Sequence, residues 1–144
     1  MLVGQILKSK PEQAVITIPP KATLTEAVTL LSQKRIGAVV VSADGKYAAG
    51  ILSERDIVRE LGKRGPACLS DAVDTVMTAK LVSCARADQT DAVLQKMTDG
   101  RFRHMPVIEG GVMVGLISIG DVVKARLEEL HAEKDALEGM IKGF

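Results

Sequence analysis

Short apolar runs alternate with amphipathic segments through the first half of the chain. Each run is four to six residues long, as is typical of buried strands in a small sheet. Between the first two runs, apolar positions recur at helical spacing from Thr23 to about Arg35, and Thr23 with Glu26 forms a capping box that opens this helix. The predicted strands are 15–18, 38–42 and 47–52.

A hairpin and a second helix complete this first unit. The turn at 43–46 contains an Asp-Gly pair, which is a strong hairpin signal, so the second and third runs are predicted to pair antiparallel. Ser53 then caps a helix that ends near Gly62 or at Gly65, where Pro66 follows. The predicted order is strand, helix, strand, strand, helix.

The second half of the chain repeats this order. Ile16 and Val82 match at an offset of 66 positions, and Gly50 and Gly115 match at an offset of 65. A duplication of this length indicates two related units. The predicted elements are strands at 81–84, 105–108 and 112–117, a helix from about Gln89 to Thr98, a Gly110-Gly111 turn before the last strand, and a final long helix.

The predicted fold class is α/β in the α+β sense, with two pseudo-symmetric repeats packed as one body, because neither repeat has enough strands to cover its own sheet. Two further segments with helical spacing are expected to cover open faces: Leu2, Val3, Ile6 and Leu7, and Val73, Val76 and Met77. The predicted boundaries are 1–66 for the first repeat with an N-terminal helix, 67–126 for the second repeat, and 127–144 for a C-terminal helical extension.

The final helix carries an apolar stripe interrupted by one lysine. Its members advance by steps of four and three residues, with Lys134 in one of the places: Val123, Leu127, Leu130, Leu137 and Ile141. Two interpretations fit this stripe. Either the helix packs on its own domain, or the stripe is a contact between protomers.

Both repeats carry the same motif at the start of their last helix. A glycine precedes a buried strand, and a serine is followed three residues later by an aspartate: Gly50-Ile51-Leu52-Ser53-Glu54-Arg55-Asp56 and Gly115-Leu116-Ile117-Ser118-Ile119-Gly120-Asp121. Ser-x-x-Asp is an ordinary helix start. It also suits a ligand, since a carboxylate accepts both hydroxyl protons of a ribose while the serine and the helix N–H groups hold phosphate. A metal site is the weaker explanation, because the chain has no dense carboxylate cluster.

A local cationic string precedes and enters the middle strand of the second repeat. It is Arg101-Phe102-Arg103-His104-Met105-Pro106-Val107, in a chain whose 19 Lys and Arg against 18 Asp and Glu leave a net charge of only +1. Two arginines suit a phosphate, and the alternative is a solvated turn with surface arginines. The first repeat keeps Arg35 but lacks the His and Pro, so the two sites are predicted to differ in charge.

Composition argues against several functional classes. Aromatic residues are limited to Tyr47, Phe102 and Phe144, which disfavours binding of single-stranded nucleic acid by base stacking. Cys68 and Cys84 stand alone, so neither a disulfide framework nor a zinc site is predicted, and we infer a reducing cytosol. No apolar run of the sequence has the length of a membrane span. We therefore expect a cytoplasmic protein without a metal ion or a membrane partner.

The duplicated unit with its Gly-hydrophobic-hydrophobic-Ser-x-x-Asp ending resembles a tandem pair of CBS domains, the regulatory modules named after cystathionine beta-synthase. The resemblance covers about residues 1–126, and the motifs at 53–56, 101–107 and 118–124 are similar to those of the small stand-alone bacterial members. It implies adenosine ligands between the repeats, with AMP foremost and NAD(H), ADP or ATP as further ligands. It also implies a homodimer that signals to an unknown regulated protein.

The resemblance further implies roles for individual residues. Asp56 and Asp121 would hold ribose. The residues near phosphate would be Ser53, Arg55, Arg103, His104 and Ser118. The base would lie along Thr17, Ile18, Gly37 and Ala38 in one site and along Ser83, Cys84, Met105 and Pro106 in the other. Because Glu54-Arg55 of the first repeat is replaced by Ile119-Gly120 in the second, the hypothesis is a mononucleotide in one site and another nucleotide in the other.

Other functional classes stay open at the level of sequence. An enzyme would need Cys84 and His104 to meet across strands, but no third orienting group and no nucleophile elbow accompany them in the sequence. A nucleic-acid binder would rest on Arg101, Arg103 and Lys80 alone, and a structural dimerisation module is the remaining alternative. The expected function is therefore non-enzymatic: a regulatory module that binds adenine nucleotides.

Overall fold

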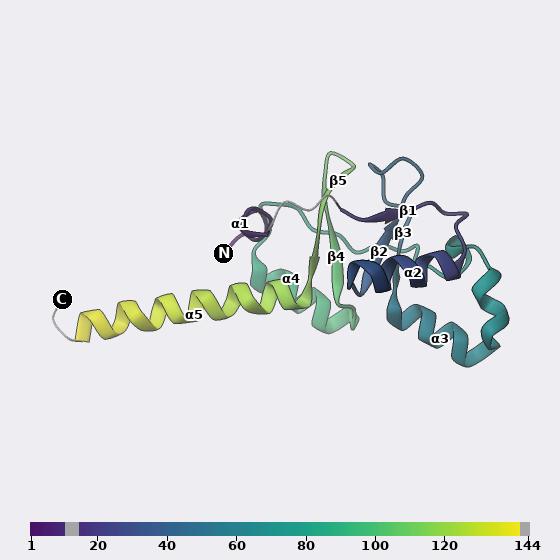
Figure 1. Cartoon of the computed structure of the whole chain (residues 1–144). Coiled ribbons are helices and arrows are strands. Elements are labelled where there is room, and N and C mark those ends of the chain that lie inside the picture. The colour runs from purple at the N-terminus through teal and green to yellow at the C-terminus, as the bar shows by residue number, and fades with distance from the viewer. Residues whose placement is uncertain (11–14, 142–144) are drawn as a thin grey trace. The chain divides into compact units, whose positions relative to one another are not determined.

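The computed structural model of the chain describes residues 1–10 and 15–141, which fall into two compact units. We call the described residues of 13–82 and 109–114 the first-repeat unit. We call those of 1–12, 83–108 and 115–144 the second-repeat unit. Small sheets with helices beside them confirm the mixed fold class (Figure 1).

The first-repeat unit contains a three-stranded sheet in the order β1-β2-β3. β1 pairs parallel with β2, and β2 pairs antiparallel with β3, so that Ala38 lies opposite Ser53. All four residues of β2 are buried, as expected for the central strand. The elements are β1 (Thr17–Ile18), α2 (Leu24–Lys34), β2 (Ala38–Val41), β3 (Gly50–Ser53), α3 (Glu54–Arg64) and the short 3-10 helices η1 (Pro66–Ser70) and η2 (Val73–Thr75).

Local signals set the helix boundaries of this unit as predicted. The Thr23 hydroxyl accepts a hydrogen bond from the N–H of Glu26 at 3.2 Å and opens α2. Ser53 caps α3, which ends before Gly65, a residue with a φ of 72° that side-chain-bearing residues adopt at a cost. The end of α2 is different, because Arg35 takes the left-handed conformation there with a φ of 54°.

The loop between β2 and β3 is longer than the sequence predicted. The Asp44 carboxylate accepts the N–H groups of Lys46 and Tyr47 at 2.8 and 2.9 Å. Ser42 Oγ donates to the carbonyl oxygen of Tyr47 at 2.7 Å. These bonds close a polar loop over 42–49, so the strands are shorter than predicted. The turn at the Asp-Gly pair is confirmed, with a φ of 77° at Gly45.

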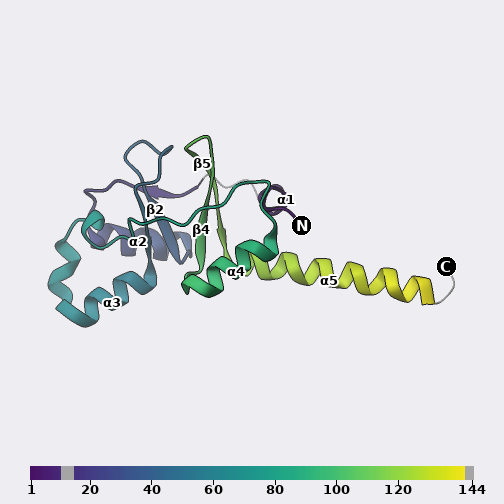
Figure 2. The same ribbon diagram turned by 180° about the vertical axis from the view of Figure 1, so that it is seen from behind.

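The second-repeat unit contains the strands β4 and β5, which pair with each other. Its helix α4 ends on Arg101 with a φ of 55°, just as α2 ends on Arg35. The glycine turn between β4 and β5 is confirmed, and its residues 109–114 belong to the first-repeat unit. The elements are α1 (Val3–Ser9), α4 (Thr90–Gly100), β4 (His104–Glu109), β5 (Val112–Ser118) and α5 (Ile119–Ile141), seen from behind in Figure 2.

The strand predicted at 81–84 is wrong, since only Cys84 forms a bridge there, parallel to Val107. In the first-repeat unit, the N–H of Val40 donates to the carbonyl oxygen of Ile16 just before β1. The position equivalent to Val40 is Pro106, which has no N–H, so the second-repeat ladder lacks this bond. Pro106 therefore accounts for the missing strand.

The N-terminal helix packs on the second repeat, which corrects its assignment to the first repeat within 1–66. The N–H of Val3 donates to the carbonyl oxygen of Asp88 at 2.9 Å. The segment 72–80 makes the corresponding contact in the first-repeat unit, where the N–H of Val73 donates to the carbonyl oxygen of Ala22 at 2.8 Å. Each repeat is therefore covered by a segment from outside its own strands and helices: residues 2–10, far upstream, cover the second repeat, and residues 72–80, which follow the first repeat, cover the first.

These two covering segments, 2–10 and 72–80, share a pattern at an offset of 70 positions. Their corresponding residues are Val3, Ile6, Leu7 and Lys10 in one segment and Val73, Val76, Met77 and Lys80 in the other. Leu7 packs over Gly115, and Met77 packs over Gly50, the glycine at the start of β3. The expectation that both segments cover open faces is confirmed, and the shared pattern extends the duplication beyond the two repeats.

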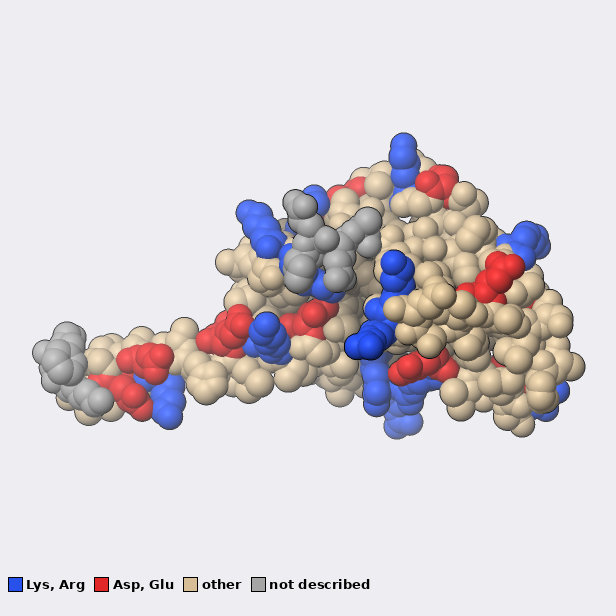
Figure 3. All heavy atoms as spheres, in the orientation of Figure 1, with Lys and Arg blue, Asp and Glu red and all other residues tan. Residues whose placement is uncertain are grey.

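One face of α5 is buried and the apolar stripe is exposed. Val122 and Ala125 are buried, whereas the side chains of Leu130 and Leu137 are about half exposed (48% and 59%). Every residue from 130 to 138 is exposed, and acidic and basic side chains are interleaved along the helix (Figure 3). The helix thus packs on its own unit through a face other than the stripe. No helix among the described residues is both long enough and apolar enough to cross a membrane.

Candidate ligand-binding site

Asp56, the first carboxylate of the duplicated Ser-x-x-Asp motif, lies at the start of α3, where the chain leaves β3. Ser53 and Asp56 cap each other: the N–H and the hydroxyl of Ser53 donate to Asp56 Oδ2 at 2.9 and 3.0 Å, and Ser53 Oγ accepts the N–H of Asp56 at 3.2 Å. The other oxygen, Oδ1, accepts from Arg59 at 3.4 Å. This geometry confirms the helix-start interpretation and leaves Asp56 partly accessible, with 12% of its side chain exposed.

Several of the predicted first-repeat residues lie next to this cap. The N–H of Glu54 donates to the carbonyl oxygen of Gly37 at 2.9 Å, and Ala38 lies opposite Ser53 in the sheet. Thr17 and Ile18 pair with Val40 and Val41, so they lie beside the other half of β2. Arg55 is exposed on the first turn of α3.

The second carboxylate, Asp121, has a similar cap, and its cation comes from a distant segment of the chain. Its Oδ2 accepts the N–H of Ser118 at 2.9 Å, and Ser118 Oγ accepts the N–H of Asp121 at 3.1 Å. Lys10 Nζ donates to the same Oδ2 at 2.9 Å and to the carbonyl oxygen of Leu116 at 3.0 Å. Burial of the Asp121 carboxyl group raises its pKa, but the hydrogen bonds from Ser118 and Lys10 and the charge of Lys10 outweigh burial, so the pKa lies below its usual value.

The predicted residues of the second repeat surround this cap through the backbone. The N–H of Ile119 donates to the carbonyl oxygen of Arg103 at 2.8 Å, which brings the end of the cationic string to the start of α5. Met105 and Pro106 are buried in β4, His104 is partly buried, and Arg103 is exposed.

Ser83 and Cys84 approach β4 from the other side. The N–H of Cys84 donates to the carbonyl oxygen of Pro106 at 3.0 Å, and the thiol Sγ lies 3.8 Å from the same oxygen. Cys84 is buried, while Ser83 beside it is partly buried. The second-repeat residues therefore gather along β4 and its two flanking backbone segments.

Lys10 is the site residue that the sequence analysis missed. The prediction of an N-terminal covering helix included Leu7 but did not continue to Lys10, although Lys80 ends the second covering segment at the same offset of 70. That shared lysine was the signal. Within residues 1–10 and 15–141, no group of three or more His, Cys, Asp or Glu side chains is arranged to hold a metal ion.

The arrangement provides two helix starts with the same donors and acceptors. At each one, a serine hydroxyl and a carboxylate lie beside backbone N–H groups, and such a set can accept ligand hydroxyl protons and bind an anionic group. The charge around the two starts differs: Glu54 and Arg55 occupy the first turn of α3, and Ile119 and Gly120 occupy that of α5. The two sites are therefore chemically related and unequal.

Comparison with known proteins places this geometry in a family. The family described as CBS domain matches residues 3–63 and 73–128. A CBS domain-containing protein of Arabidopsis thaliana, named as mitochondrial, is 34% identical over 98% of this chain and 72% of its own length. Several other curated relatives are longer, and the chain spans 24% of their length.

Solved structures agree with this assignment. The crystal structure of a CBS-domain containing protein from Agrobacterium tumefaciens has a TM-score of 0.83 and 42% identity, over 88% of this chain and 99% of that chain. A CBS domain protein from Pyrobaculum aerophilum, complexed with AMP, has a TM-score of 0.77 and 25% identity, over 92% and 99% of the two chains. The chain belongs to the CBS-domain family and is a tandem pair of CBS domains, as its duplicated motifs predicted.

Proposed function

We propose that the chain is a regulatory module that binds adenine nucleotides at its two Ser-x-x-Asp sites. The observation that carries the proposal is the duplicated carboxylate, which caps the last helix of each repeat and stays partly exposed, at 12% for Asp56 and 25% for Asp121. A carboxylate in this position can accept the two hydroxyl protons of ribose. The AMP complex of the Pyrobaculum aerophilum relative supports an adenosine ligand.

The two sites are proposed to differ in the ligand that they bind. Ribose is held by Asp56 in one site and by Asp121 in the other. AMP is the foremost proposed ligand, and NAD(H), ADP or ATP are further candidates for the same sites. In the second site, His104 and Arg103 add cationic groups near the phosphate. In the first site, Arg55 lies on the first turn of α3 next to Glu54. A mononucleotide in one site and a second nucleotide in the other fits this inequality.

The response to the ligand is proposed to pass to other proteins. A ligand shifts a protein between arrangements only as far as it binds one of them better than the other. The chain is proposed to act in the cytoplasm without catalysing a reaction, as a homodimer that contacts a regulated protein. The exposed stripe of α5 is the surface proposed for self-association, because Leu130, Leu137 and Ile141 are left uncovered in the protomer.

Calorimetric titration with AMP tests the binding sites directly. Asp56→Asn and Asp121→Asn each keep a side-chain oxygen that can accept the serine N–H, so the helix caps are retained while the negative charge is lost. Each variant is expected to weaken AMP binding at one site by about ten to a hundredfold, the range for losing a charged hydrogen-bond acceptor. Asp135→Asn, at an exposed position of α5, is the matched control.

Two results separate the proposal from its alternatives. Loss of AMP binding in the double variant Asp56→Asn, Asp121→Asn, with an unchanged thermal unfolding midpoint, supports the ribose assignment. If the double variant and Asp135→Asn bind AMP equally well, the two carboxylates are helix caps and nothing more.

A further inference from the structure

Lys10 reaches Asp121 from the N-terminal covering segment. Its Nζ lies 2.9 Å from Asp121 Oδ2 and 3.0 Å from the carbonyl oxygen of Leu116, and the two charged side chains are 33% and 25% exposed. Oδ2 also accepts the N–H of Ser118, so this oxygen already has two donors. The ion pair lies at the carboxylate that the proposed function assigns to ribose.

The position of Lys10 is fixed by packing of the covering segment. Val3 and Ile6 are buried, at 0% and 3% exposure, and Leu7 fills the space over Gly115. The N–H of Lys10 donates to the carbonyl oxygen of Ile6 at 3.2 Å and closes the end of α1. Packing of α1 therefore holds Lys10 next to Asp121.

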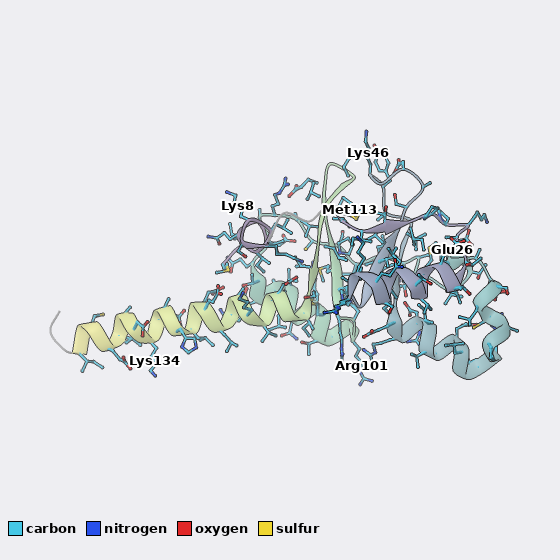
Figure 4. The ribbon with its side chains drawn as sticks, viewed as in Figure 1. Lys8, Glu26, Lys46, Arg101, Met113 and Lys134 are labelled. Carbon is cyan, nitrogen blue, oxygen red and sulfur yellow. The ribbon has the colours of Figure 1, made fainter. Side chains whose placement is uncertain are left out.

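The neighbouring lysine of the same helix behaves differently. Lys8 is exposed and extends away from α1 in Figure 4, and no ion pair of Lys8 is formed among the described residues. The two lysines have the same charge and lie two positions apart. Contact with Asp121 therefore distinguishes Lys10 from a general surface cation.

The first repeat shows that this contact is not required by the cap. Asp56 keeps the same exchange with Ser53, but its ion pair is with Arg59 on its own helix. Lys80, which corresponds to Lys10, is exposed. The cap forms in both repeats, so Lys10 is not needed to start α5, and its contact with Asp121 must have another role.

We propose that Lys10 is a built-in competitor at Asp121, which makes the second site select phosphorylated adenosine over adenosine itself. The inference rests on the proposed function. Oδ2 already accepts from Ser118 and Lys10, so a ribose that places its two hydroxyl groups on the two oxygens of this carboxylate must displace Lys10 or share Oδ2 with it. A phosphate gives the displaced ammonium group a new anionic partner, whereas adenosine offers none. The ion pair is partly exposed, so it is weak enough for a ligand to open.

The test compares adenosine and AMP in calorimetric titrations of the full chain carrying Asp56→Asn, which weakens the first site so that the tighter binding step reports on the second. Lys10→Met is expected to bind adenosine about fivefold more tightly than Lys8→Met, the effect of a partly exposed ion pair. The preference for AMP over adenosine is expected to fall by at least the same factor. Lys10→Arg keeps the charge and is expected to keep the preference.

The possible outcomes separate this inference from the proposed function. Equal preferences in Lys10→Met and Lys8→Met overturn the competitor role. Weaker AMP binding without tighter adenosine binding also overturns it and makes Lys10 a simple phosphate ligand. If the Asp56→Asn chain with Lys10 intact does not bind AMP while Asp121→Asn does, the second site itself is rejected and the role of Lys10 with it. Thermal unfolding of each variant establishes that the chain is folded.

Discussion

The two repeats build the same carboxylate cap and surround it with different cations. In the first repeat, Asp56 is paired with Arg59 from its own helix at 3.4 Å. In the second repeat, Asp121 is paired with Lys10 from a covering segment at 2.9 Å. The cap depends on residues three positions apart, whereas the cation at the second site comes from 111 positions away.

Both repeats have a cationic residue at each of these two positions, but a different one contacts the carboxylate in each repeat. Lys124 corresponds to Arg59 at the offset of 65, and Lys80 corresponds to Lys10 at the offset of 70. Both Lys124 and Lys80 are exposed. The Ser-x-x-Asp motif therefore specifies a helix start, and we infer that the segments around it set which ligand each site prefers.

The helices that follow the two caps differ in length and in exposure, and substitutions on the longer one are expected to have the strongest effect. α3 ends before Gly65, whereas α5 continues to Ile141 with every residue from 130 to 138 exposed. Leu130→Glu with Leu137→Glu is expected to weaken self-association at least a hundredfold, because burial of a leucine contributes about 2 kcal/mol. Sedimentation equilibrium measures this change.

The control for α5 keeps the added charges and moves them off the stripe. Ala132→Glu with Ala136→Glu, at exposed positions of the same helix, is expected to leave self-association nearly unchanged. AMP affinity is expected to be retained in both double variants. Equal weakening by the two pairs of substitutions would contradict a specific role for the stripe.

The glycines beneath the two covering segments differ in the space that they leave for an added side chain. A Cβ at Gly50 would lie 2.5 Å from Met77 Sδ and 2.8 Å from the carbonyl oxygen of Thr78, which is held in a bridge to Ile51. A Cβ at Gly115 would lie 2.6 Å from a methyl group of Leu7, a side chain that can rotate. Gly50→Ala is therefore expected to lower the free energy of unfolding by about 2–3 kcal/mol and Gly115→Ala by about 1 kcal/mol.

Urea unfolding of the two variants measures this difference. Gly62→Ala in α3 is the control and is expected to be neutral or stabilising, because an added Cβ meets no atom of the described residues within 4 Å beyond the helix's own backbone. If Gly115→Ala lowers the free energy of unfolding as much as Gly50→Ala does, the two covering segments are packed with equal rigidity, which contradicts the expected difference between the repeats.

The smallest effect concerns acid stability. The folded-state pKa of Asp121 is below its usual value of 3.8, so Asp121 adds stability that is present above the usual pKa and is lost as the pH falls through the folded-state value. Lys10→Met removes one cause of the lowered pKa. Its acid unfolding midpoint is expected to move to higher pH by about a few tenths of a unit relative to Lys8→Met. Circular dichroism as a function of pH measures the midpoint, and identical midpoints would show that the ion pair adds no stability.

The sequence predicted the features that depend on local chemistry. The capping residues Thr23, Ser53 and Ser118 all lie where the motifs indicated, because a hydroxyl and an N–H three positions apart are enough to start a helix. The glycine turn of the second hairpin follows from the same kind of local preference. The fold class and the duplication could be predicted from the sequence because they follow from these local elements.

The features that the sequence did not predict depend on contacts between distant segments. The strand at 81–84 failed because Pro106, on another strand, lacks the donor that a longer ladder needs. The repeat on which α1 packs is decided by backbone bonds to Asp88 and Arg86, and apolar spacing alone does not name that partner. Lys10 follows from the same placement, since its contact with Asp121 exists only where α1 meets the second repeat.

Mass spectrometry of the small molecules that co-purify with the native chain shows whether Asp56 and Asp121 hold adenine nucleotides. The measurement compares the unmodified chain with the folded double variant Asp56→Ala, Asp121→Ala, prepared in the same way. Adenine nucleotides are expected on the unmodified chain, with AMP among them, and are expected to be lost from the double variant. The same nucleotides in the same amount on both proteins would contradict the assignment of the two aspartates to ribose.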